Sequence, residues 1–168
     1  MKIGVPKEIK PQENRIGLTP ESVKTLISNG HEVLVENNGG FEAGFDNKQY
    51  ESSGAKIVNN AEDIFNDAEV IVKVKEPLSN EVKMIRENQI VFTYLHLAAA
   101  KELTRGLIES KAICIAYETV TDNDGKLPLL APMSAVAGRM SVQAGAHCLE
   151  KNQKGRGLLL GGAPGVEP

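Results

Sequence analysis

Short apolar runs alternate with amphipathic stretches from residue 2 to residue 116 of the chain. Runs rich in β-branched and aromatic residues predict strands at 2–5, 31–36, 55–58, 69–75, 89–95 and 111–116. Between them, apolar residues at helical spacing predict helices at 20–28, 46–50, 61–65, 80–87 and 98–110. Strands that alternate with helices favour a parallel sheet covered on both faces. We therefore expect a doubly wound, mostly parallel α/β domain of the Rossmann-like or flavodoxin-like class.

The segment after residue 120 has a different pattern. A polar turn at 121–126 and a proline-interrupted stretch at 127–132 indicate a boundary, and a helix is predicted from about 135 to 151. Small residues share one face of this helix: Ala137, Ser141, Ala144, Gly145 and Cys148. Because small side chains let another backbone approach closely, we expect the helix to join two domains; a core helix is the alternative. The predicted division is 1–130 and 131–168.

Composition bounds the class of protein. The chain has 168 residues and 41% apolar content, which suffices for one continuous core. Nineteen basic against 22 acidic residues give a net charge of −3 without a lysine or arginine block, so nucleic acid is not an expected partner. No apolar run approaches the ~20 residues that span a bilayer, and Met1–Lys10 lacks an apolar signal segment. We therefore expect no membrane association and a cytoplasmic location.

Four polar side chains are predicted near the carboxyl ends of the strands, where doubly wound sheets bind ligands. Arg15 lies in the loop after the first strand, and Lys75 ends the strand at 69–75. His96 follows the strand at 89–95, and Glu118 follows the strand at 111–116. Parallel strands end at the same edge of a sheet, so we expect these side chains to converge.

The chemistry of these residue types suits a small acid. Arg15 presents a planar fork that fits a carboxylate, and Lys75 presents a compact charge that stabilises an oxyanion. His96 is the natural proton carrier at neutral pH. Each also has a plainer interpretation, as a solvated arginine, a lysine extending into solvent and a packing histidine.

Two further positions are weaker candidates. Glu118 is a secondary binding candidate, because an acid in an irregular segment also serves to accept backbone amides. Ser134 is most simply the N-cap of the following helix, although a hydroxyl there also suits a cofactor contact. No metal-ligand spacing is present. The segment Gly155-Arg-Gly157-Leu-Leu-Leu160 starts like a dinucleotide fingerprint but lacks the third glycine and a following helix.

Several sequence motifs allow a comparison with a known protein family. The segments Gly4-Val-Pro-Lys-Glu8, Glu13-Asn-Arg15 and Thr19-Pro20 resemble the opening of the alanine dehydrogenase and nicotinamide nucleotide transhydrogenase superfamily. Further segments resemble its alanine dehydrogenase branch: Val72-Lys-Val-Lys-Glu-Pro77, Tyr94-Leu-His-Leu-Ala98, Ala116-Tyr-Glu-Thr-Val120, Leu129-Leu-Ala-Pro-Met-Ser134 and Gly161-Gly-Ala-Pro-Gly-Val-Glu-Pro168. The resemblance runs in order along the whole chain.

The resemblance implies an NAD-dependent, reversible oxidative deamination of L-alanine to pyruvate and ammonium by a cytoplasmic homohexamer. It implies that Arg15 holds the substrate carboxylate and that Lys75 contacts the carboxylate and carbonyl region. His96 is then the general acid and base. The segment 1–130 becomes the substrate-binding domain, and 131–168 becomes the connecting helix and the start of the NAD-binding domain.

The resemblance also implies that Tyr94 and Met133 line the pocket and that Ser134 touches the cofactor. In the family, the glycine fingerprint, a catalytic aspartate and a returning segment follow Pro168. Because these parts are absent from the chain, we expect it to be inactive alone.

Two alternatives remain. The nucleotide-binding subunit of the transhydrogenases shares the opening motif, but it needs no small-acid pocket such as Leu95-His-Leu-Ala98 suggests. A non-catalytic regulatory α/β module is the other. A phosphoacceptor domain of that kind requires acids at the end of the first strand, where Pro6-Lys7 stand.

Overall fold

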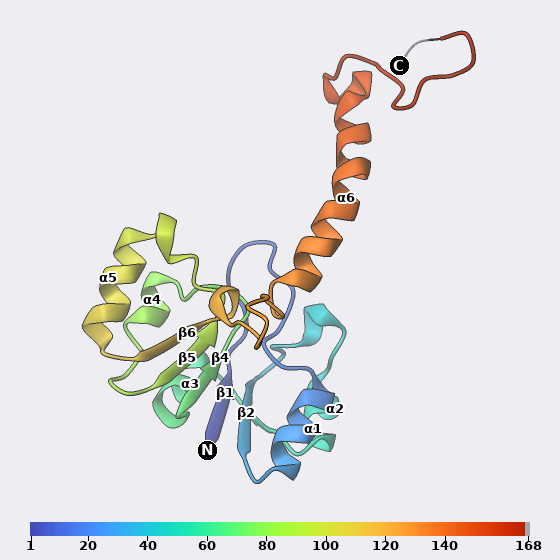
Figure 1. The fold of residues 1–168 in the computed structure, drawn as a ribbon. Helices are drawn as coiled ribbons and strands as arrows, with labels where there is room; N and C mark the ends of the chain where they lie inside the picture. Colours follow the sequence, from blue (N-terminus) through green and yellow to red (C-terminus); the bar gives the residue numbers. More distant parts are fainter. Residues whose placement is uncertain (167–168) are drawn as a thin grey trace. The chain divides into compact units, whose positions relative to one another are not determined.

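The fold is seen in a computed structural model that describes residues 1–166 (Figure 1). The last two positions of the predicted 131–168 segment lie outside the described residues. The chain divides into two compact units, Met1–Val120 (unit 1) and Thr121 onward (unit 2). The roles expected for 1–130 and 131–168 stay predictions.

Unit 1 is built on a six-stranded sheet of order β3-β2-β1-β4-β5-β6, in which every neighbouring pair is parallel. The strands are β1 (Lys2–Val5), β2 (Glu32–Glu36), β3 (Lys56–Val58), β4 (Val70–Val72), β5 (Ile90–Thr93) and β6 (Ile113–Ala116). The predicted doubly wound α/β class is confirmed, with the strand order of the Rossmann fold. The order reverses between β1 and β4, which makes their carboxyl ends the switch point of the sheet.

Helices cover both faces of the sheet (Figure 1). They are α1 (Pro20–Ser28), α2 (Asn47–Ser52), α3 (Ala61–Asp67), α4 (Ser79–Val82) and α5 (Lys101–Ser110). Val23 of α1 and Tyr50 of α2 pack in a core cluster on one face. Ile64 and Phe65 of α3 pack with Leu107 of α5 in a second cluster on the other face.

Local sequence sets the starts of these helices. The Thr19 side chain accepts the amide of Ser22 at 3.3 Å at the start of α1, as its sequence predicts. At α2, Asp46 accepts the amide of Gln49 at 2.9 Å, and Gln49 accepts the amide of Asp46 at 2.8 Å. This capping box satisfies two backbone donors that the helix itself leaves without partners.

The strand predicted at 69–75 is shorter in the structure. Strand β4 ends at Val72, so Lys75 lies past the strand instead of ending it. Past the end of β4, the amide of Val74 donates to the carboxylate of Glu8 at 2.6 Å. The adjacent helix is shorter too: α4 spans Ser79–Val82, starting one residue before the predicted 80–87 and ending five residues earlier.

Unit 2 contains one long helix, α6 (Ala131–Leu149). It starts before the predicted residue 135, because a proline is tolerated in the first turn of a helix, where Pro132 stands. The prediction of Ser134 as N-cap is wrong. The cap is Leu130, whose carbonyl oxygen accepts the amide of Ser134 at 3.2 Å. Within residues 1–166, no helix is long and apolar enough to cross a membrane.

Candidate active site

The predicted site residues of unit 1 lie in the segments that follow the carboxyl ends of its strands. Arg15 lies in the loop between β1 and α1, and Lys75 lies after β4. Tyr94 and His96 follow β5, and Glu118 lies in a single helical turn after β6. Parallel strands bring these segments to one edge of the sheet. Arg15 and Lys75 follow β1 and β4, whose carboxyl ends form the switch point where open α/β sheets bind ligands.

The loop that carries Arg15 passes directly over the end of β4. A β-carbon added at Gly17 would lie 2.5 Å from the carbonyl oxygen of Val72, the last residue of that strand. Only glycine allows this approach. The contact brings the Arg15 loop against the segment that carries Lys75.

A buried carboxylate holds the backbone of that segment. One oxygen of Glu8 accepts the amide of Val74 at 2.6 Å and the amide of Lys75 at 3.2 Å. The hydroxyl of Thr93 donates to the carbonyl oxygen of Lys75 at 2.9 Å. Both peptide groups of Lys75 are therefore fixed, one by the loop after β1 and one by β5.

Lys73 connects Glu8 to a second acid. Its ammonium lies 3.3 Å from Glu8 and 2.7 Å from Glu81, and all three side chains are at most 2% exposed. Glu81 also accepts the amide of Leu78 at 2.8 Å. We call Glu8, Lys73 and Glu81 the buried triad. It ties the start of the chain to the segment from β4 to α4.

No role for the buried triad was predicted from the sequence. Lys73 carried a usable signal, because a lysine inside the apolar run Val70-Ile-Val-Lys-Val74 requires a buried anion. Nothing local in the sequence indicated that Glu8 and Glu81 supply the two carboxylates.

Arg15 is paired with Glu13. Its Nε donates to Glu13 at 2.8 Å and its Nη2 at 2.6 Å, which makes a two-pronged ion pair. The side-chain hydrogen bond from Arg15 lowers the pKa of Glu13 to about 2 against the opposing effect of burial, and the charge of Lys75 adds to the lowering. Glu13 therefore stays ionised and orients the guanidinium, a role that the sequence analysis missed.

His96 has an unusual backbone that Glu118 holds in place. Its φ of 50° and ψ of 38° lie in the left-handed region, which is uncommon for a residue other than glycine. One carboxylate oxygen of Glu118 accepts the amide of His96 at 2.7 Å and that of Leu95 at 3.1 Å. Burial raises the pKa of Glu118, but these backbone hydrogen bonds outweigh it, so the pKa is lowered overall.

Aromatic side chains form the floor beneath His96. The ring of Tyr94 is stacked on that of His96, with centroids 5.9 Å apart and an interplanar angle of 11°. Tyr94 also meets Tyr117 edge-on at 4.9 Å, and Tyr117 meets Phe92 edge-on at 4.3 Å. The imidazole is exposed on top of this stack, where it is accessible to a ligand.

Glu76 is a further acid at this edge. It forms an ion pair with Lys10, while its second oxygen is buried with no hydrogen-bond partner in the described part of the chain. Burial raises the pKa of Glu76. The hydrogen bond from Lys10 and the charges of Lys10 and His96 outweigh that effect and lower it overall.

Two predicted site residues belong to unit 2. Met133 and Ser134 lie in the first turns of α6, Met133 partly buried and Ser134 exposed. Their predicted place in one pocket with Arg15 and His96 stays a prediction.

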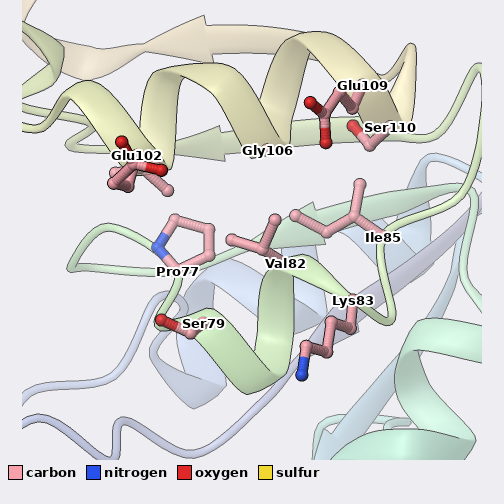
Figure 2. Close-up of a pocket in the computed structure, with 10 residues that line it drawn as sticks. Pro77, Ser79, Val82, Lys83, Ile85, Glu102, Gly106, Glu109 and Ser110 are labelled. Carbon is pink, nitrogen blue, oxygen red and sulfur yellow. The ribbon is translucent and has the colours of Figure 1, made fainter.

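A groove of about 440 Å³ runs between α4 and α5, and none of the predicted site residues lines it (Figure 2). Val82 and Ile85 point toward α5, with Glu102 and Glu109 on the opposite wall. The helices are in close contact at Gly106, where an added β-carbon would lie 2.8 Å from Val82. Within residues 1–166, no cluster of three or more His, Cys, Asp or Glu side chains is arranged to hold a metal ion.

Comparison with known families gives one extended match. Residues 4–137 match the family model "Alanine dehydrogenase/PNT, N-terminal domain". The alanine dehydrogenase of Halomonas elongata is 55% identical over 168 residues, which is all of this chain and 45% of that protein. The alanine dehydrogenase of Bacillus subtilis is 54% identical over 166 residues, or 99% of this chain and 43% of that protein. The chain therefore spans less than half the length of these relatives.

Comparison with solved structures agrees with these sequence matches. An L-alanine dehydrogenase superposes with a TM-score of 0.88 at 54% identity, over 100% of this chain and 46% of that chain. A transhydrogenase from Sinorhizobium meliloti superposes with a TM-score of 0.66 at 29% identity, over 70% of this chain and 34% of that chain. The fold is shared with both, and the first likeness is the more extensive.

Proposed function

This chain belongs to the alanine dehydrogenase/PNT N-terminal domain family, and from that membership we propose that it is the substrate-binding part of an alanine dehydrogenase. The reaction is L-alanine + NAD⁺ + H₂O → pyruvate + NH₄⁺ + NADH + H⁺, in either direction. The observation that carries the proposal is the agreement with relatives of that name along the full chain. The polar edge with Arg15, Lys75 and His96 suits a small oxo acid.

Arg15 and Lys75 are the proposed substrate-binding cations. Arg15 binds the carboxylate of pyruvate or alanine, and Glu13 presents the guanidinium to it. Lys75 contacts the carboxylate and the carbonyl oxygen. Its charge stabilises the negative charge that develops on that oxygen during attack by ammonia.

His96 is the proposed general acid and base. Its ring is exposed and stacked on Tyr94, so it is placed to give and take protons at the substrate carbon's nitrogen and oxygen substituents. Glu118 acts through the backbone of His96 instead of touching the substrate. Tyr94 and Met133 line the pocket, and Ser134 contacts the cofactor.

NAD accepts and donates the hydride when it is bound, but the residues described in this chain do not fit its usual cradle. After Gly155 the structure has turns and one isolated bridge, Ala163 to Val166, without a strand, glycine turn and helix in succession. We propose that the main NAD site lies in another part of the polypeptide and that this chain alone is inactive. We further propose that the complete enzyme is a cytoplasmic homohexamer.

The test uses the complete polypeptide that contains this chain. NADH oxidation is measured with pyruvate, with and without ammonium, for the native protein and for His96→Ala. We expect oxidation that requires ammonium and falls about 10²–10⁴-fold in His96→Ala. His31→Ala is the matched control, because His31 precedes β2 at the opposite edge of the sheet.

Absence of ammonium-dependent pyruvate reduction, together with hydride exchange between NADH and an NADP analogue, would replace the proposal with a transhydrogenase function. The lower identity and coverage of the transhydrogenase structure argue against that alternative.

A further inference from the structure

Glu8 is a buried acid that reaches the segment carrying Lys75 from the loop after β1. It is 7% exposed as a whole residue, and its side chain is 2% exposed. Its carboxylate accepts the amides of both Val74 and Lys75. Among residues 1–166, no other side chain is hydrogen-bonded to the Lys75 amide.

The hydrogen bonds to Glu8 and Thr93 fix the peptide groups on both sides of the Lys75 α-carbon. The Lys75 amide is held by Glu8 and its carbonyl by Thr93. The preceding residue is held twice, because the Val74 amide donates to Glu8 and its carbonyl accepts the Tyr94 amide at 3.3 Å. The α-carbon from which the Lys75 side chain extends is therefore held in place.

We propose that Glu8 is a positioning residue for Lys75, which sets where the Lys75 ammonium meets the substrate. This inference rests on the proposed function, since it assigns Lys75 to the substrate. A displacement of about 1 Å in a reacting group costs up to about 100-fold in rate. Loss of the hydrogen bonds to Glu8 is therefore expected to lower the turnover of pyruvate.

Glu81 provides a matched control on the other side of Lys73. Like Glu8 it is a buried acid that pairs with Lys73 and accepts a backbone amide, in this case that of Leu78. Its hydrogen bonds and ion pair go to Leu78 and Lys73 and not to Lys75. Removing either acid leaves Lys73 paired with the remaining carboxylate, so both variants keep a balanced buried charge and both are expected to fold.

The experiment compares Glu8→Ala, Glu8→Gln and Glu81→Ala in the complete polypeptide. Pyruvate and NADH are varied separately in the ammonium-dependent assay, and thermal unfolding is followed alongside. We expect Glu8→Ala to lower kcat/KM for pyruvate about 10- to 100-fold while KM for NADH changes less than about twofold. Glu8→Gln retains an oxygen that accepts both amides, so it recovers at least half of that loss on a logarithmic scale.

Glu81→Ala is expected to lower thermal stability about as much as Glu8→Ala but to change kcat/KM for pyruvate less than about threefold. Equal losses of kcat/KM in the two alanine variants would overturn the proposal, because a purely structural role predicts equality. An unchanged kcat/KM in Glu8→Ala would overturn it as well.

Amide hydrogen exchange separates this inference from the proposed function. In Glu8→Ala the amides of Val74 and Lys75 should exchange at least about 10-fold faster, whereas in Glu81→Ala the faster amide should be that of Leu78. If the native protein does not reduce pyruvate, the proposed function fails, and exchange still decides whether Glu8 fixes the backbone of Lys75. If the amide of Lys75 exchanges at the native rate in Glu8→Ala, the inference is wrong even if the native protein is active.

Discussion

Unit 1 and helix α6 keep their structure in different ways. Unit 1 buries complete side chains on both faces of its sheet and encloses the triad of Glu8, Lys73 and Glu81. None of the 19 residues of α6 is buried, and Val136, Met140 and Val142 are each more than half exposed. The conformation of unit 1 is therefore specified by tertiary contacts, and that of α6 by its own backbone hydrogen bonds and helix propensity.

The difference predicts that equivalent substitutions have unequal, even opposite, effects in the two regions. The largest effect is expected at Lys73. Lys73→Ala leaves two buried carboxylates without their cation, which should lower the free energy of unfolding of unit 1 by about 3–5 kcal/mol. Urea denaturation measures the loss, with the exposed Lys101→Ala of α5 as control. A loss below about 1 kcal/mol would mean that the triad is hydrated and that burial does not specify this region.

The next effect is expected from Gly4→Ala in β1. The added methyl carbon would lie 2.4 Å from Ile64 and 2.8 Å from Ala68 of the α3 segment, so α3 must move away from the sheet. Overpacking of this kind should destabilise unit 1 by about 1–3 kcal/mol. Thermal unfolding measures it, and a variant as stable as the native chain would show that the contact between β1 and α3 is loosely packed.

Lowering the pH should reduce the stability of unit 1 through protonation of Glu13 and should leave the stability of α6 unchanged. The folded-state pKa of Glu13 is about 2 against an ordinary 4.5, so the pair with Arg15 contributes stability above about pH 4.5. That contribution is lost as the pH falls from 4.5 toward 2. Because Arg15 is half exposed, we expect about 1 kcal/mol, seen as a difference between native and Glu13→Gln chains at pH 5 that disappears near pH 2.

The residues of α6 include no carboxylate, so amide exchange within it should show no difference between these two chains across the same pH range. A difference that persists at pH 2 would assign the stabilisation to packing of Glu13 instead of to its charge.

The smallest effect has the opposite sign. An added β-carbon at Gly145 of α6 meets nothing within 4 Å, so Gly145→Ala adds helix propensity without a clash. We expect amide exchange in α6 to slow by an amount that corresponds to about 0.5–1 kcal/mol. Faster exchange would show that α6 depends on close contacts of its small residues.

Local patterns were enough to predict the elements of unit 1, because runs such as Ile90–Thr93 are β-branched and aromatic and the start of α1 is capped by Thr19. The errors occur where distant residues decide the local structure. β4 ends at Val72, and beyond it Glu8 accepts the amide of Val74, a partner 66 positions away that no local pattern announces. The start of α6 was misplaced for another reason, since Pro132 was treated as an interruption although the first helical turn accepts it.

The site shows the same division. Placement at strand ends was enough to bring Arg15, Lys75, His96 and Glu118 to one edge of the sheet, because parallel topology does so for any sequence. The residues that hold these side chains in place were harder to predict. The pair of Glu13 and Arg15 is local, since the two residues stand two positions apart. Glu118, in contrast, accepts the amide of His96 from 22 positions away. Such contacts depend on register between strands, which residue type alone does not encode.

The span of the buried triad also sets an order of events during synthesis. Glu8 precedes Lys73 by 65 positions, and Glu81 comes later still. At about 5–20 residues per second, the ribosome needs about 3–13 s to supply the cation that Glu8 requires. Until then the loop after β1 cannot bury this acid in its final surroundings. The loop after β1 is therefore not locked in its final contacts until α4 has emerged.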